Sequence, residues 1–448
     1  MSLDLMLRLT PELISGDDAP VYGVAWNKGS SPTLTRTDKA VGLVAAAGVD
    51  AGVVTNDFDR LDIYRDITEV TDALGNVFVR IPRFYIEKTD GVSSKTWRIS
   101  KRKFSATAYL PWCFYDFATS RVLDYVDVGK YVASLSGASK LESKSETYPL
   151  INKTIVDFRT YAQANGAGYQ QLDLHVVDVL QTLFYVEFAT LNSQAIMAGF
   201  TTGQWSASHT ATATEAGANR IVVANATAAL YRVGQAISIG TSLGGNQVCY
   251  GRTVTSIDVV DASNKALVFD GAAVNVATGN IVYNTGWKAG FSSGIAASSG
   301  SLVSNSSGLY AFKYRGVENL WGNIWQFVDG LNINERQAWV CANAASYASN
   351  LFAPPYMQLS YVDGNADGWI TAMGWDAATP YAALPTAVGG GTATYFGDYY
   401  YQSTGQRIAL LGGYWFGGSV AGLSYWALAH TSSSAVVNVG SRLLRKAL

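Results

Sequence analysis

The clearest periodic pattern of apolar residues lies between residues 172 and 191. The apolar positions recur at intervals of three and four residues, at Leu172, Val176, Val179, Leu180, Leu183 and Phe184, and the pattern continues through Phe188 and Leu191. This spacing places the side chains on one face of an α-helix. A shorter helix is predicted over 153–165, ended by Gly166. These two segments are predicted to hold most of the helical content.

Period-two patterns predict strands elsewhere. Residues 76–88 (N-V-F-V-R-I-P-R-F-Y-I-E-K) alternate after a turn at Gly75. Between Trp205 and Asn284 the chain has short β-branched runs, at 220–223, 236–239, 253–257 and 266–269, punctuated by Gly, Asn and Asp. Such spacing is typical of a small all-β barrel or sandwich. We expect it to be an inserted module, and its role as a spacer or as a second binding module stays open.

Composition narrows the classes of function. The chain has 448 residues, 48% hydrophobic and 15% charged, with 44 Gly and 26 Tyr, which favours a folded, turn-rich protein of two or three units. The net charge of -2 argues against nucleic acid as a partner, because phosphate binding needs clustered positive charge. Neither a signal peptide nor a membrane-inserted segment is expected. Cys113, Cys249 and Cys341 are predicted to be free thiols of a protein made in a reducing cytoplasm.

One segment suggests a metal. Residues 363–368 (D-G-N-A-D-G) match the first half of an EF-hand calcium loop, with candidate ligands Asp363, Asn365 and Asp367. The glutamate that should complete the loop is replaced by Gly374. A polar turn and a weak calcium site are therefore both open. No other metal and no organic cofactor is expected, since the three histidines are far apart in the sequence.

Three passages near the C-terminus share glycines and large aromatic or apolar residues. They are 320–328 (L-W-G-N-I-W-Q-F-V), 411–415 (L-G-G-Y-W) and 439–444 (V-G-S-R-L-L). In this order they resemble the G-N-V-W-E-W-V, R-G-G-S-W and I-G-F-R-L motifs of the C-type-lectin fold of the formylglycine-generating-enzyme type. The expected structural scaffold is Trp321, Gly322, Asn323, Trp325, Gly412, Gly413, Trp415, Trp426 and Arg442, with Arg442 bonding carbonyls to anchor the last strand.

The resemblance covers about residues 76–448 and implies a fold class. We expect an α+β protein, a C-type-lectin-like domain with two helices that is interrupted by the small all-β insertion. The implied division is 1–71 as an attachment segment, 72–204 and 286–448 as the two parts of the lectin-like domain, and 205–285 as the insertion. The enzymes of that family need a cysteine pair near the C-terminal strand, which is missing after Gly412. No catalytic residue is therefore assigned.

Within that fold the chain looks most like phage tail receptor-binding proteins of the major-tropism-determinant type, which retroelements diversify. The resemblance implies ligand binding between the Gly412–Gly413 turn and the last strand. The implied ligand-binding residues are Tyr414, Phe416, Ser419, Val420, Tyr425, Ala427, Ala429, His430, Ala435 and Val437. These residue types are among those expected when asparagine codons are randomised at adenines, as in retroelement diversification. An ordinary tail tip with a fixed sequence is an equally open alternative.

The expected function is that of a non-enzymatic phage tail-tip adhesin. It would bind a bacterial surface receptor, protein or glycan, as a homotrimer in the virion together with other tail or baseplate proteins. Two alternatives are a structural baseplate component without receptor binding and a carbohydrate-active enzyme, since two carboxylates for sugar hydrolysis need not be close in sequence.

Overall fold

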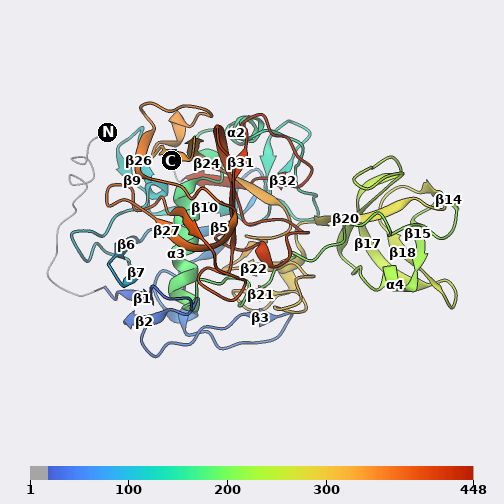
Figure 1. The fold of residues 1–448 in the computed structure, drawn as a ribbon, viewed down its shortest axis with the longest axis horizontal. Helices are drawn as coiled ribbons and strands as arrows, with labels where there is room; N and C mark the ends of the chain where they lie inside the picture. The colour runs from blue at the N-terminus through green and yellow to red at the C-terminus, as the bar shows by residue number, and fades with distance from the viewer. Residues whose placement is uncertain (1–18, 447–448) are drawn as a thin grey trace.

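The computed structural model describes residues 19–446 of the chain, drawn in Figure 1. It is predominantly β, with 38% strand and 11% helix, and the described residues hold three α-helices. The predicted α+β lectin-like fold with two helices is wrong, because the chain forms many sheets and a curled half-barrel. Helical spacing is confined to short stretches, so more backbone groups find their hydrogen-bond partners between strands than within helices.

The largest sheet has nine strands and carries most of the C-terminal half. Its order is β26 (Met357–Val362), β25 (Gln337–Val340), β24 (Trp325–Asn334), β30 (Gln406–Leu411), β31 (Trp426–His430), β29 (Tyr399–Gln402), β27 (Gly368–Gly374) and β28 (Leu384–Val388), with β32 (Val439–Gly440) paired to β24. Shifts of register interrupt its pairing at four strand pairs. Such bulges bend strands and increase their twist.

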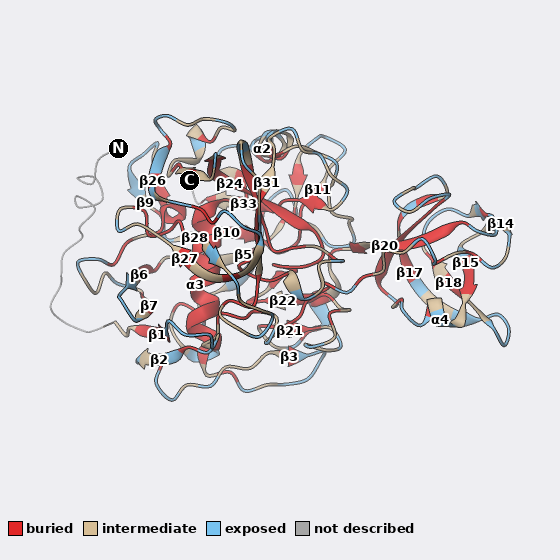
Figure 2. Cartoon of the chain, in the orientation of Figure 1, coloured by how far each residue is buried: buried red, intermediate tan, exposed pale blue. Residues whose placement is uncertain are grey.

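Helix α3 (Leu174–Phe188) forms the centre of the molecule. Asp173 caps it by accepting a hydrogen bond from the backbone N–H of Val176, and the helix ends at Ala189 in the left-handed region. All fifteen residues are buried, and the helix is red along its length in Figure 2. Its buried acids have cationic partners, Lys88 for Asp178 and Arg315 for Glu187. The helix is therefore enclosed on every side, whereas the sequence pattern predicted only one apolar face.

Helix α2 (Ile155–Gln163) covers the other face of the nine-stranded sheet. Its first turn is closed by a capping box between Thr154 and Asp157. Alternate residues of β30 divide between two cores: Ala409 and Leu411 join the α3 core, while Ile408 and Leu410 join the core that includes α2. This division is the period-two alternation of a strand covered on both faces.

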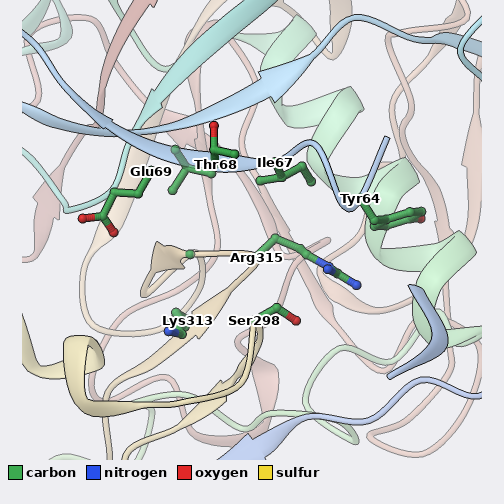
Figure 3. A pocket seen from close by; sticks show the side chains of 9 residues that line it. Tyr64, Ile67, Thr68, Glu69, Ser298, Lys313 and Arg315 are labelled. Atoms are coloured by element: carbon green, nitrogen blue, oxygen red, sulfur yellow. The ribbon is translucent and has the colours of Figure 1, made fainter. Parts of the chain in front are cut away.

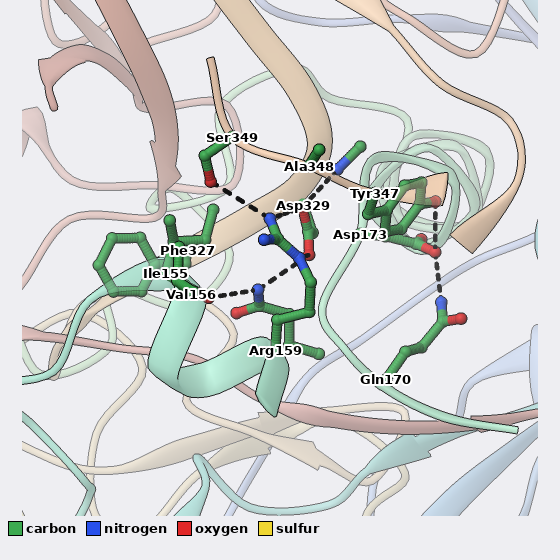
Figure 4. A network of polar contacts seen from close by, with 12 residues as sticks. Ile155, Val156, Arg159, Gln170, Asp173, Phe327, Asp329, Tyr347, Ala348 and Ser349 are labelled. Carbon is green, nitrogen blue, oxygen red and sulfur yellow. Dashed lines mark hydrogen bonds and ion pairs between the residues drawn. The ribbon is translucent and has the colours of Figure 1, made fainter. Parts of the chain in front are cut away.

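A buried network of polar contacts attaches α2 to strand β24 (Figure 4). Arg159 donates from Nε and Nη2 to the two carboxylate oxygens of Asp329, each at 2.8 Å. Gln171 donates to the same carboxylate at 2.9 Å and to the carbonyl of Ile155 at 3.0 Å. The ring of Phe158 packs beside these groups on Phe327, with ring centroids 5.6 Å apart. The charge of Asp329 is therefore paired inside the protein.

Smaller sheets surround α3. A four-stranded sheet has the order β2 (Thr35–Asp38), β1 (Tyr22–Asn27), β7 (Ser94–Ser100) and β6 (Tyr85–Asp90). A five-stranded sheet has the order β13 (Tyr169–Gln171), β33 (Leu443–Lys446), β10 (Tyr125–Gly129), β5 (Val77–Pro82) and β4 (Thr68–Thr71). A third has the order β23 (Val317–Glu318), β22 (Phe312–Tyr314), β21 (Gly300–Ser301) and β3 (Gly48–Val49). Two-stranded pairs join β8 (Tyr115–Asp116) to β9 (Arg121–Val122) and β11 (Ser134–Leu135) to β12 (Leu141–Glu142).

The segment expected as an attachment arm, 1–71, is integrated into these sheets over its described part. Residues 19–71 supply strands β1, β2, β3 and β4 to three different sheets. Residues 1–18 lie outside the described part of the chain. No helix among residues 19–446 is both long enough and apolar enough to cross a membrane.

A separate β unit projects from the main body at the right of Figure 1. Its sheet has the order β15 (Arg220–Ala224), β18 (Asn264–Phe269), β17 (Cys249–Val259), β16 (Gln235–Gly240) and β20 (Ile281–Trp287), with a second pair of β14 (Glu215–Ala218) and β19 (Val274–Val276). One helical turn, α4 (Asn225–Ala228), accompanies them. The unit has its own apolar core and occupies the stretch expected as the insertion, 205–285.

Candidate functional site

The residues predicted as scaffold are all buried. Asn323 joins three segments: it donates its N–H to Phe200 O at 2.8 Å, accepts from the N–H of Trp415 at its carbonyl, and accepts from the N–H of Trp287 at Oδ1. Gly322 has φ of +65°, and a Cβ there would lie 2.6 Å from Phe200 O. Arg442 is fully buried and donates to Gln326 and to four backbone carbonyls. These contacts hold the C-terminal segments against the body.

The ten residues predicted to bind ligand differ in exposure. Phe416, Ser419, Ala435 and Val437 are exposed, while Tyr414, Val420, Ala429 and His430 are half-buried. Tyr425 and Ala427 are buried. The structure brings Tyr414, Val420, Tyr425 and Ala427 into one apolar cluster beside the sheet. His430 lies elsewhere, at the end of β31 opposite Ile408 of β30.

Tyr414 and Tyr425 belong to a continuous line of aromatic rings, which we call the aromatic row. In order it contains Trp369, Tyr399, Tyr425, Trp325 and Tyr414. The successive ring centroids are 5.6, 6.0, 4.4 and 6.4 Å apart. Tyr425 and Trp325 form its buried floor, while Trp369, Tyr399 and Tyr414 are half-exposed. The row is therefore an apolar strip that reaches the surface at both ends.

Strand geometry explains why these rings meet. In β29, Tyr399 and Tyr401 point to one face, and Tyr400 points to the other, where it is fully buried. Strand β29 runs parallel to β31, and Tyr401 lies opposite Ala427. Ala427 is small, so it leaves room over the sheet for neighbouring rings. Tyr401 itself is 46% exposed, and Phe416, two residues after Tyr414, is 48% exposed, so both add open aromatic surface.

Tyr425 is the electrostatic centre of the row. Burial raises the pKa of its hydroxyl, and the neighbouring groups Tyr414, Tyr399, Asp367 and Tyr401 raise it further. The phenol therefore stays protonated at neutral pH and can donate a hydrogen bond. Its neighbours converge on it from separate segments of the chain. The row thus combines ring surface with hydroxyl groups.

The turn that carries Tyr425 is held by a buried acid. Asp398 accepts a hydrogen bond from the N–H of Ser424 at 2.6 Å, and a Cβ on Gly422 would lie 1.9 Å from its other carboxylate oxygen. That position thus requires glycine. Burial raises the pKa of Asp398 well above its usual range. The close approach of Asp398 to the backbone positions the turn before β31.

Several members of the surface were missed by reasoning from the sequence. Trp369, Tyr399 and Tyr401 were not among the predicted ligand-binding residues, and Trp325 was assigned to the scaffold. The clustered tyrosines at 399–401 were a usable signal, because alternate residues of a strand emerge on one face. Their position next to β31 follows from a parallel pairing that no local pattern reveals.

Other candidate groups are the possible metal ligands and the cysteine thiols of the described residues. Within residues 19–446, no three His, Cys, Asp or Glu side chains form a group suited to a metal ion. The three cysteines are free and buried. Burial raises the pKa of the thiols of Cys249 and Cys341 to about 11, so both are protonated at neutral pH and are weak nucleophiles.

A polar pocket of about 170 Å³ lies between β4, β5 and β22 (Figure 3). Its charged side chains already have partners. Arg315 binds Glu187 and Asp59, Lys313 donates to the carbonyl of Ile295 at 2.7 Å, and Glu69 pairs with Lys130. Burial lowers the pKa of Lys313. Two of the three charged groups are therefore in ion pairs, and the Lys313 ammonium is held by a carbonyl.

No protein-family model matches the sequence, and no curated protein matches it significantly.

Proposed function

We propose that this protein is a phage tail-tip adhesin that binds a bacterial surface receptor through the aromatic row and the exposed rings of Tyr401 and Phe416. The observation that carries the proposal is the row itself. Large rings with hydroxyl groups provide contact area at a low entropic cost, and they are enriched at binding hot spots. Rings of this kind suit stacking on a sugar as well as packing on a protein loop.

The phage context comes from the three C-terminal sequence passages and from the position of the row. The passage between the Gly412–Gly413 turn and the last strand supplies Tyr414 and Tyr425 to the row. Strand β3 and the segments that flank it expose the apolar residues Val44, Val49 and Val53. A surface of that kind suits contact with other tail proteins or with further copies of the chain.

Copies of the chain in one tail would strengthen binding. Weak contacts at a single site become strong when several linked sites engage one cell surface, because the later contacts are effectively intramolecular. We therefore propose a homotrimer as the functional form. Light scattering of the purified protein tests this, and a stable monomer would contradict it.

The structure suggests which residues to change. Tyr425 is only 8% exposed, so its removal would disturb packing as well as binding. Tyr401→Ser, Tyr414→Ser and Phe416→Ser in one variant alter the open surface and spare the floor. A matched control variant combines Val92→Ser, Val233→Ser and Tyr250→Ser, which change exposed apolar residues elsewhere.

Binding of the purified proteins to a panel of bacterial strains tests the function. We expect strain-selective binding by the wild type and by the control variant. The variant with Tyr401, Tyr414 and Phe416 changed to serine should lose about 100-fold in affinity, because each lost ring costs about 1 kcal/mol or more. Periodate treatment of the cells identifies a glycan receptor, and protease treatment identifies a protein receptor. Equal binding by all three proteins refutes the row as the site, and binding to no strain favours a structural tail component.

A further inference from the structure

The loop between β26 and β27 holds a buried carboxylate without a partner. Asp363 is 2% exposed, and neither of its carboxylate oxygens accepts a hydrogen bond from the described part of the chain. An isolated buried charge is strongly unfavourable unless it is neutralised or binds a cation. The side chain thus needs either a proton or a metal ion.

A second oxygen beside the same loop also lacks a partner. Gln402 donates from Nε2 to the carbonyl of Asn365 at 3.3 Å and from its backbone N–H to Oδ1 of Asp367 at 2.9 Å. Its Oε1 is buried and accepts no hydrogen bond within residues 19–446. Exchanging the amide oxygen and nitrogen would place an oxygen against the carbonyl of Asn365. The amide oxygen therefore belongs where it is, as a free acceptor.

The buried side chain of Tyr400 contacts the same loop. The Tyr400 hydroxyl donates to the carbonyl of Gly364 at 3.3 Å. Arg336 is the neighbouring cation, and its guanidinium contacts the carbonyl of Asp363 at 3.4 Å instead of the carboxylate. Asp367 is exposed, so the loop is open to solvent on that side.

We propose that the loop 363–368 binds one calcium ion, with the Asp363 carboxylate as its main ligand and oxygens of Asp367 and Gln402 beside it. The available donors are all oxygens, which are the ligands that calcium prefers, and calcium accepts irregular geometry more readily than magnesium. Gln402, from a different strand, replaces the glutamate that an EF-hand loop would supply at Gly374. Two carboxylates next to an arginine predict a weak site, with Kd of about 10⁻⁴ to 10⁻³ M.

The ion would join β27 to β29 next to the aromatic row. Gly368 and Trp369 pair with Tyr400 and Tyr399 where the loop ends. Asp367 also accepts a hydrogen bond from the backbone N–H of Gln402, in the strand that carries Tyr399. Calcium would therefore hold Trp369 and Tyr399 in place for the receptor. This link rests on the proposed function, whereas the metal site does not.

Isothermal titration of the chelator-treated full chain with calcium chloride tests the site, with magnesium chloride as the comparison. We expect one calcium per chain, a higher melting temperature in calcium, and a weaker response to magnesium. Asp363→Asn should abolish calcium binding. It should fold, because it removes an unpaired buried charge and keeps the shape. Asp367→Asn should weaken binding at least tenfold.

Asp261→Asn is the matched control. Asp261 closes an exposed turn in the inserted unit by accepting hydrogen bonds from Ser263 and Asn264, and it should leave calcium binding unchanged. The absence of heat and of a thermal shift at about 10 mM calcium, tenfold above the weakest expected Kd, overturns the site. Equal binding by Asp363→Asn overturns it too. If the protein binds calcium but binds cells equally well in calcium and in chelator, only the link between the metal site and the row is refuted.

Discussion

Replacing Arg159 with methionine should destabilise the protein by breaking the ion pair between α2 and β24. The Asp329 side chain is 3% exposed, and Arg159 supplies two of its hydrogen bonds. After the substitution, Gln171 and the backbone N–H of Gly330 are the donors to the carboxylate that remain within residues 19–446. The methionine keeps most of the apolar volume of the arginine side chain. The main change is therefore an uncompensated buried charge.

The magnitude follows from the burial of the acid. Removing one partner of a buried pair costs about 3–5 kcal/mol. Because two donors remain on Asp329, we expect a loss near the lower end, about 3 kcal/mol. Asp329→Asn removes the other charge and leaves a guanidinium that is 13% exposed and still touches water. Its cost should be smaller, about 1.5–3 kcal/mol for the lost charged hydrogen bonds.

The double variant Arg159→Met with Asp329→Asn isolates the interaction energy of the pair from the effects that each substitution has on other neighbours. It leaves no buried charge, so its cost should be about 2 kcal/mol less than the sum of the single variants. Urea unfolding, followed by tryptophan fluorescence and circular dichroism, measures the free energies. The control is Arg220→Met, which breaks an exposed pair with Glu215 and should cost less than about 1 kcal/mol. A loss below about 1 kcal/mol for Arg159→Met, or additive single losses, would refute the reasoning.

Two further predictions concern buried groups near the C-terminus. Arg442→Met removes five buried hydrogen bonds and should cost more than about 4 kcal/mol in urea unfolding, whereas a loss below about 2 kcal/mol would contradict this. Burial raises the pKa of Asp398 above its usual 3.8, so the folded state retains a proton that the unfolded state loses. As the pH rises above 3.8 toward the pKa of the folded state, the free energy of unfolding of the wild type should therefore fall by about 1.4 kcal/mol per pH unit relative to that of Asp398→Asn. A difference that stays constant with pH would refute the raised pKa.

Local patterns predicted individual elements better than their assembly. Helix α3 lies within the stretch where apolar residues recur at helical spacing, because that period is a property of neighbouring residues. The same pattern suggested a solvated opposite face, yet Asp178 and Glu187 are buried. They tolerate burial because Lys88 and Arg315 reach them from distant segments. The overall class was mispredicted for a related reason, since resemblance in three short passages does not determine how many strands the rest of the chain forms.

For the candidate site, the sequence by itself determined which residues can supply aromatic rings and oxygen atoms, and which positions are glycines that leave room for neighbouring side chains. Gly422 and Gly413 leave room for close neighbours, and the D-G-N-A-D-G loop places oxygens at alternate positions. Only the tertiary structure decided that Tyr399 meets Tyr425, and that Gln402 lies against the loop of Asp363. Both depend on the pairing of β29 with β27 and β31. Side-chain alternation is local and visible in sequence, whereas the choice of partner strand depends on packing between segments far apart in the chain.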